Sequence, residues 1–214
     1  MTLHAPSMTA DTLADAAWPT RAGNFVRMAI LAIAGSALLA LLAKIQVPMI
    51  PVPMTMQTFG VLALAAAYGW PLGAVTVALY LAEGFVGLPV FACATPAAVC
   101  SGPAYFAGTT GGYLIGFVVA AGLVGWLCQT RQWDRQPIKA AAAMVLGNLV
   151  IYAFGLVWLH TLLGTIRGVA GWTLLRTWNA GAANFLVGDL VKVLLAAALL
   201  PLAWKAVQRF RSGT

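Results

Sequence analysis

The stretch FLVGDLVKVLLAAALLPLAW at residues 185–204 decides the fold class, because it is long and apolar enough to cross a membrane as one helix. Asp189 and Lys192 nevertheless lie inside it. Since they are three residues apart, their side chains share one face of a helix. Ionisable side chains within a membrane are rare and cost about 2.5–3.5 kcal/mol each on insertion, so the pair is a candidate functional site.

The pair has two interpretations. It can be a structural ion pair facing the helix bundle, in which each charge offsets part of the other's desolvation. It can also belong to a ligand pocket, because Asp189 lies about one turn from the expected outer end of its helix. A carboxylate accepts N–H groups and an ammonium group donates up to three hydrogen bonds. A small ligand with N–H groups and a carbonyl would match both, with apolar residues around its body.

The composition places the whole chain in a membrane. Of 214 residues, 62% are hydrophobic and only 8% are charged, and the mean hydropathy is +0.90. These values predict an all-α integral membrane protein with no room for a sizeable soluble domain. The net charge of +7 does not indicate a nucleic-acid partner, because the basic residues gather at the ends of the apolar segments, as the positive-inside rule describes.

Six apolar segments are expected to form six transmembrane helices in a single membrane domain, residues 24–205. Residues 1–23 have no secretory signal pattern and are expected to be an unstructured cytoplasmic tail, and residues 206–214 a short basic tail. The expected spans are 24–44, the two halves of 54–90 divided at 68–73, 110–129, 138–163 and 181–205.

The distribution of lysine and arginine predicts the orientation. With a cytoplasmic N-terminus, eight of these residues fall on the inner side and three on the outer side, so both termini are predicted to be cytoplasmic. The inner residues are Arg21, Arg27, Arg131, Arg135, Lys139, Lys205, Arg209 and Arg211, and the outer ones are Lys44, Arg167 and Arg176.

Three long connections are expected on the outer side, at 44–54, 87–110 and 164–181. The last is expected to be an interfacial helix with an aromatic belt or, alternatively, part of a lid. The second holds Cys93 and Cys100, which would form a disulfide in an oxidising compartment and otherwise be two buried thiols.

Further polar residues at similar depth are candidates for contacting a ligand. Glu83 is expected near the outer end of the third span, where it would bind a ligand, be exposed at the interface or bond to a neighbouring helix. Gln57 begins the second span. The stretch GTTGGYLIGF at 108–117 begins the fourth span, where Tyr113 would contact a ligand or join an aromatic belt. Its glycines would admit a ligand or pack closely against a neighbouring helix.

Several chemistries are absent from the sequence. His4 and His160 have no metal-ligand spacing, and no metal site or cofactor is expected. There is no GxxxxGK[ST] phosphate loop and no recognisable nucleophile pair. The chain is therefore expected to bind or pass a small solute and not to be an enzyme. The alternatives are a stand-alone, gradient-driven carrier, an intramembrane enzyme using Glu83, Asp189 or His160, and a structural scaffold.

Three stretches resemble the BioY family in order and spacing: IPVPMTMQTFGVLALAAAYGWPLGAVTVALYLAEGFVGLPVFA at 50–92, GGYLIGF at 111–117 and VGDLVK at 187–192. The resemblance implies the six-helix fold of the substrate-binding S components of energy-coupling factor (ECF) transporters, in the bacterial cytoplasmic (inner) membrane. It implies high-affinity capture of biotin from outside. It also implies two kinds of partner, a transmembrane coupling protein and cytoplasmic ABC-type ATPases.

The resemblance also implies roles for individual residues. Asp189 and Lys192 are expected to bind the polar groups of biotin, with the 44–54 and 87–110 loops closing over the ligand. The residues expected to bind the ligand are Asp189, Lys192, Tyr113, Gln57, Glu83 and Thr110. The small residues expected to contact the coupling protein are Ala32, Ser36 and Ala40.

Overall fold

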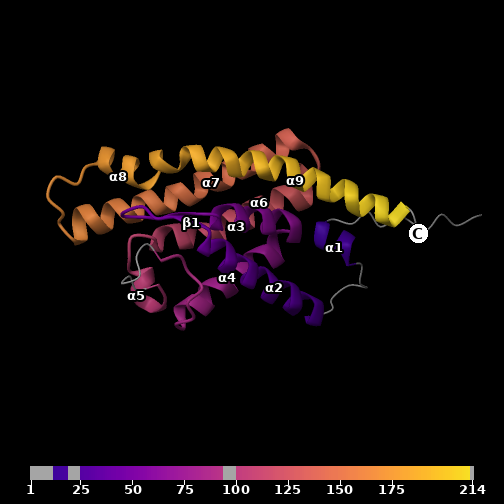
Figure 1. The fold of residues 1–214 in the computed structure, drawn as a ribbon, viewed down its shortest axis with the longest axis horizontal. Coiled ribbons are helices and arrows are strands. Elements are labelled where there is room, and N and C mark those ends of the chain that lie inside the picture. Colours follow the sequence, from indigo (N-terminus) through magenta and orange to yellow (C-terminus); the bar gives the residue numbers. More distant parts are fainter. Residues whose placement is uncertain (1–11, 19–24, 94–99, 213–214) are drawn as a thin grey trace, which may run out of the picture.

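The structure is a computed structural model that describes residues 12–18, 25–93 and 100–212. It is built almost entirely of helices, with one short β-hairpin (Figure 1). The elements are α1 (Leu13–Ala17), α2 (Phe25–Lys44), β1 (Gln46–Val47), β2 (Met54–Thr55), α3 (Gln57–Tyr68), α4 (Trp70–Phe85), α5 (Gly102–Phe106), α6 (Gly111–Arg131), a 3-10 turn (Trp133–Arg135), α7 (Pro137–His160), a π-helical turn (Thr161–Ile166), α8 (Leu174–Gly181), a second 3-10 turn (Ala183–Phe185) and α9 (Leu186–Ser212).

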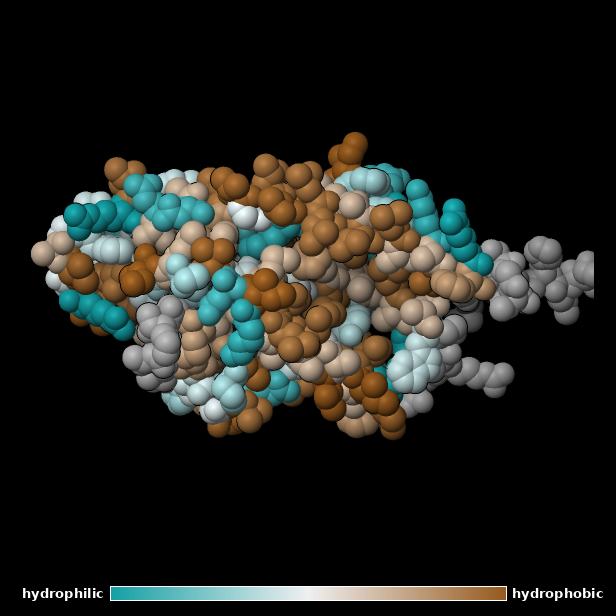
Figure 2. Space-filling model, in the orientation of Figure 1, coloured by the Kyte–Doolittle hydropathy of each residue, from teal (hydrophilic) through white to brown (hydrophobic). Residues whose placement is uncertain are grey.

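Four helical segments within the described residues are long and apolar enough to cross a membrane. They are Phe25–Lys44, Gly111–Arg131, Pro137–Ile166 and Leu174–Phe210; the third includes the π-helical turn after α7, and the last includes α8 and the second 3-10 turn before α9. The apolar pair α3 and α4 is shorter, with 12 and 16 residues. Figure 2 shows hydrophobic side chains over much of the middle of one face, as expected for a surface in contact with lipid.

The α3–α4 hairpin turns at Gly69. This residue has a φ of 81°, a conformation that favours glycine, and its N–H closes α3 on the carbonyl of Ala65. Pro71 follows in the first turn of α4, where its missing N–H is tolerated. The predicted turn at 68–73 is therefore confirmed.

Helix α6 is the centre of the bundle and α2 lies at its edge. In the most apolar part of each helix, 67% of the α6 residues are buried within the chain, compared with 22% for α2. Helix α6 packs most closely on α7 because glycine stands at the contact. A Cβ atom on Gly112 would lie 2.2 Å from the Cβ of Trp158, and one on Gly116 would lie 3.0 Å from the Cα of Ile151. Of the two interpretations of these glycines, close helix packing is confirmed.

The expectation of an unstructured N-terminal tail is wrong for residues 12–18. These residues form α1, whose N-terminus is capped by the Thr12 side chain, and Asp15 pairs with Arg27 of α2 at 3.0 Å. The helix forms because Leu13 and Ala16 are buried in the core of the chain. Residues 1–11 and 19–24 of the expected tail lie outside the described residues. At the other end of the chain, α9 continues past residue 205 to Ser212.

The connection between α6 and α7 is anchored to α9. Trp204 of α9 donates an indole N–H bond to the buried carboxylate of Asp134, and the Arg135 guanidinium lies 4.2 Å from the centre of the Trp204 ring. Burial raises the pKa of Asp134 above its usual value. This connection and α1 lie towards the end of the bundle opposite the β-hairpin, α5 and α8 (Figure 1).

Candidate functional site

A cavity lies between helices α3, α6, α7 and α9 and is covered by the segment around the β-hairpin. Its volume is about 60 Å³. Most of its wall is apolar or aromatic, and the polar groups converge from the ends and middles of different helices. The lining residues are Val52, Pro53, Met54, Thr55, Gln57, Thr58, Tyr105, Thr110, Tyr113, Leu114, Phe117, Asn148, Ile151, Tyr152, Phe185, Asp189 and Lys192.

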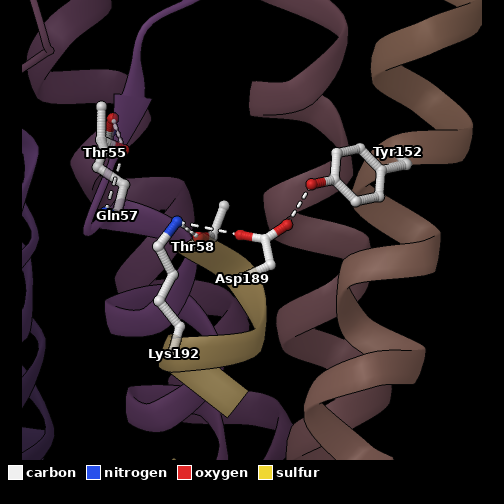
Figure 3. A network of polar contacts seen from close by, with 6 residues as sticks. All are labelled: Thr55, Gln57, Thr58, Tyr152, Asp189 and Lys192. Carbon is white, nitrogen blue, oxygen red and sulfur yellow. Dashed lines mark hydrogen bonds and ion pairs between the residues drawn. The ribbon is translucent and has the colours of Figure 1, made fainter. Parts of the chain in front are cut away.

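Asp189 and Lys192 form a buried, hydrogen-bonded pair at this cavity, and each is only 7% exposed. The Lys192 ammonium group lies 3.1 Å from one carboxylate oxygen of Asp189 and donates to the Thr58 hydroxyl at 2.9 Å. The other carboxylate oxygen accepts the Tyr152 phenol O–H. Figure 3 shows these contacts, which run from the Lys192 ammonium group to Thr58 and to Asp189, and from the Asp189 carboxylate to Tyr152.

This network leaves capacity for a ligand. Each carboxylate oxygen of Asp189 has a further lone pair, and the ammonium group of Lys192 has a third proton beyond its bonds to Asp189 and Thr58. Burial strengthens charge-assisted hydrogen bonds, because little water competes with them. The arrangement therefore presents one strong acceptor and one strong donor, side by side, to a small molecule with both N–H groups and an oxygen.

Three other residues of the predicted binding set also line the cavity. The side chain of Gln57 is held in place, because its amide donates to the Tyr80 hydroxyl at 2.7 Å and accepts from the Thr55 hydroxyl at 3.2 Å. The Tyr113 hydroxyl donates to the carbonyl of Gly181 at 2.8 Å. Thr110 stands at the N-terminus of α6. Gln57 and Tyr113 therefore face the cavity with their polar atoms already bonded to protein.

Glu83 is not among the described residues that line the cavity, and its expected role in binding a ligand stays a prediction. Its carboxylate accepts the hydroxyl of Ser36 across the contact between α4 and α2. The sequence allowed this outcome as a bond to a neighbouring helix. Whether Glu83 faces the cavity or a neighbouring helix depends on the direction in which its side chain leaves α4. The depth of the residue in its span does not determine this direction.

The row of small residues on α2 also points into the chain. Ala32 and Ser36 are buried and Ala40 is partly buried. In this structure the small side chains of the row let α4 approach α2, and the expected contact with a partner stays a prediction. Ile33 and Leu41 belong to the exposed side of α2, with 61% and 67% of their surface accessible.

The two outer loops expected to close over a ligand lie against each other. Lys44 donates to the carbonyls of Pro89 and Phe91 at 2.8 and 2.7 Å. The Thr109 hydroxyl donates to the carbonyl of Pro51 at 2.7 Å. Burial raises the pKa of the Tyr105 phenol, whose O–H donates to the Ala92 carbonyl at 3.0 Å. Residues 94–99 lie outside the described part of these loops.

No residue of α8 is among the described residues that line the cavity. Leu174, Leu175 and Trp178 of α8 are exposed, whereas Thr177 is buried and bonds to His160 and Trp172. This pattern is typical of an interfacial helix and does not support a lid.

Cys93 and Cys100 are joined by a disulfide in the structure, with their Cα atoms 5.3 Å apart. We expect mass spectrometry of unreduced, denatured protein after alkylation to find label on Cys128 alone, which is a buried free thiol in the folded chain. Prior reduction should add two further labels. The bond joins two cysteines seven residues apart and should stabilise the fold by roughly 2–3 kcal/mol. Labelling of all three cysteines without reduction would show that the bond does not form.

Sequence reasoning missed several lining residues, which are Thr58, Tyr105, Phe117, Asn148, Tyr152 and Phe185. Asn148 and Tyr152 carried a usable signal, because they are the polar residues of the otherwise apolar stretch 140–157 and stand four residues apart on one helix face. Thr58 directly follows Gln57 but has an ordinary sequence context. Among the described residues, no group of three or more His, Cys, Asp or Glu is placed to hold a metal ion.

Known proteins are similar to this chain in sequence and in fold. The sequence pattern of the BioY family matches residues 9–209. A biotin transporter BioY of Thermotoga maritima is 33% identical over 173 residues, covering 81% of this chain and 92% of that protein. One from Rhodobacter capsulatus is 37% identical over 160 residues, covering 70% and 79%. The crystal structure of an S-component for biotin from an ECF-type ABC transporter has the same fold, with a TM-score of 0.70, 21% identity and coverage of 87% of this chain and 95% of that one. The chain therefore belongs to the BioY family.

Proposed function

We propose that this chain binds biotin and takes part in its uptake as the substrate-binding subunit of an ECF transporter. The observation that carries the proposal is the hydrogen-bonded Asp189–Lys192 pair at a mostly apolar cavity, in a chain whose relatives are named biotin transporters. The chain is a transport protein and not an enzyme, in keeping with its family.

The chemistry of biotin matches the cavity. The ureido ring offers two N–H donors and one carbonyl acceptor, so Asp189 accepts an N–H group and Lys192 donates to an oxygen, either the ureido carbonyl or the carboxylate. The thiophane ring and valerate chain lie on apolar and aromatic walls such as Phe117, Ile151 and Phe185. The Asp189–Lys192 pair is thus a recognition site, and its two charges hold each other in place when no ligand is bound.

The cavity must enlarge to take the ligand. Its volume of about 60 Å³ suits a few water molecules and lies below the roughly 300–1,000 Å³ of small-molecule sites. Side-chain hydrogen bonds such as those of Lys44 and Thr109 hold the outer loops together over the cavity, so these bonds have to open when the ligand enters. Biotin therefore enters from the side of the β-hairpin, and the loops close over it.

The expected membrane arrangement completes the proposal. The four long apolar segments, with α3 and α4 as a short fifth and sixth span, form a six-helix bundle in the bacterial cytoplasmic membrane. Both termini are cytoplasmic, because lysine and arginine predominate at that end. Energy for uptake comes from a transmembrane coupling protein and ABC-type ATPases, since this sequence has no phosphate loop.

Binding and energisation are tested separately. We expect purified, detergent-solubilised protein to bind biotin with nanomolar affinity in a calorimetric titration and not to bind riboflavin, which lacks a fused cyclic urea of this size. Absence of biotin binding by folded protein would refute the proposal. Biotin accumulation in cells that express this chain without the ATPases would instead favour a stand-alone, gradient-driven carrier.

Tyr152 orients the Asp189 carboxylate, and we expect Tyr152→Phe to weaken biotin binding by roughly 10-fold to 100-fold. A hydrogen bond to a charged group contributes about 1.5–3 kcal/mol, and its loss leaves the carboxylate less well placed. Tyr68→Phe is the matched control, because it removes a phenol bonded to the Leu31 carbonyl away from the cavity. If the Tyr152→Phe and Tyr68→Phe variants bind biotin with equal affinity, Tyr152 does not contribute to the binding site.

A further inference from the structure

Asn148 of α7 is a buried polar residue at the edge of the cavity. It is 9% exposed and lies one helical turn from Tyr152, towards the α6–α7 connection. Its side chain lines the main cavity and also a second, much smaller cavity, which it shares with Thr58 and Lys192. Asn148 therefore stands at the floor of the site, where the two cavities meet.

The amide of Asn148 makes no hydrogen bond to any other residue that the structure describes. Buried polar side chains are nearly always hydrogen-bonded, and leaving one without a partner costs about 1–3 kcal/mol. The neighbouring Thr58 hydroxyl already accepts from Lys192, and the ammonium group of Lys192 also bonds to Asp189. The Asn148 side chain lines the two cavities, where a partner from outside the chain can reach its amide.

The two cavities differ in what they can supply. The smaller one has a volume of about 10 Å³, room for one water molecule at most. Its other walls are apolar, formed by Phe59, Leu62, Met144 and Val193. The main cavity is larger and holds the Asp189 carboxylate. The main cavity is therefore the place where Asn148 can meet a partner that also reaches Asp189.

We propose that Asn148 contacts the polar head of the ligand and makes the site specific for a neutral cyclic urea. This inference rests on the proposed function and adds a residue to it. The amide is uncharged and offers both an acceptor and two donors, as a urea does. Lys192 is the cation beside it, so a neutral Asn148 leaves a single charge of each sign, Asp189 and Lys192, in the network around the head group.

The proposal predicts a switch in specificity. 2-Iminobiotin has the shape of biotin but carries a guanidine in place of the urea, which is cationic at neutral pH. Asn148→Asp changes the charge beside the head group without changing the size of the side chain. We expect this variant to bind biotin roughly tenfold more weakly and 2-iminobiotin more tightly than the wild type does, because charge-assisted hydrogen bonds favour the cation.

The experiment is calorimetric titration of both ligands into wild-type protein and the Asn148→Asp, Asn148→Leu and Thr76→Val variants. Asn148→Leu should weaken biotin binding by about tenfold or more without favouring 2-iminobiotin. Thr76→Val is the control, because it removes a buried hydroxyl bonded to the Leu72 carbonyl. Thermal unfolding of each variant separates loss of binding from loss of fold.

The outcomes are distinct. Opposite changes for the two ligands in Asn148→Asp support direct contact. Equal changes for both ligands, or biotin binding by Asn148→Leu that equals that of Thr76→Val, overturn the inference while leaving the biotin site intact. If the wild type binds neither ligand, the proposed function fails and the inference fails with it.

Discussion

Replacing Lys192 by methionine is expected to weaken biotin binding by at least about 100-fold, the largest effect on binding that the structure predicts. The change removes the donor that faces the ligand and leaves Asp189 as a buried charge whose remaining protein partner is Tyr152. Breaking a buried ion pair by removing one partner costs roughly 3–5 kcal/mol, so the variant should also unfold at a lower temperature. Calorimetric titration and thermal unfolding in detergent measure the two effects.

The double variant Asp189→Leu/Lys192→Met separates recognition from stability. Replacing a buried pair by apolar residues of similar volume is often neutral, so stability should return to near that of the wild type. Binding should remain lost, because neither the acceptor nor the donor is restored. Leu190→Ala, on the exposed side of α9, is the control for changes to this helix. A double variant that binds biotin like the wild type would show that the pair is only structural.

Gly112→Val is expected to cause the largest loss of stability among the changes that leave the binding residues intact. Its Cβ atom would lie 2.2 Å from the Cβ of Trp158 and 2.6 Å from the Phe154 carbonyl oxygen, so α6 and α7 would have to move apart. Overpacking of this kind costs about 1–3 kcal/mol and occasionally more. The expected result is a fall of roughly 10 °C in the unfolding temperature or loss of folded protein. Thermal unfolding of protein in detergent measures it.

Gly122→Val is the matched control for this change. It introduces the same side chain on the same helix, where no atom lies within 4 Å of the new Cβ. We expect Gly122→Val to retain the stability of the wild type to within about 1 kcal/mol, since the new side chain meets no other atoms and valine has a somewhat higher helix propensity than glycine. Similar losses at both positions would show that the α6–α7 contact is looser than the structure has it.

The close packing of α6 on α7 also explains why the cavity sits beside this contact. Tyr113 projects from α6 over Gly155 of α7, where a Cβ atom would lie 2.3 Å from its ring. One turn away, Tyr152 of α7 reaches Asp189 of α9. The glycines therefore bring two aromatic residues to the edge of the cavity, and a stability defect at Gly112 should be accompanied by weaker ligand binding.

The sequence by itself determined the class of the protein and the ion pair of its site, Asp189 and Lys192. Apolar segments of sufficient length predict membrane helices, because water is unavailable to satisfy exposed backbone groups in lipid. Asp189 and Lys192 could be paired from their spacing alone, since residues three apart share a helix face. Cys93 and Cys100 could be paired because they are close together in one loop.

Only the tertiary structure decided which helix faces meet. Helices such as α7 are apolar on nearly every side, so their sequences do not indicate which face points inward. For that reason the sequence did not show that Glu83 bonds to Ser36, or that Tyr152 bonds to Asp189, 37 residues away. The partner of a polar side chain depends on the rotation of two helices about their axes, which the packing of the whole bundle determines.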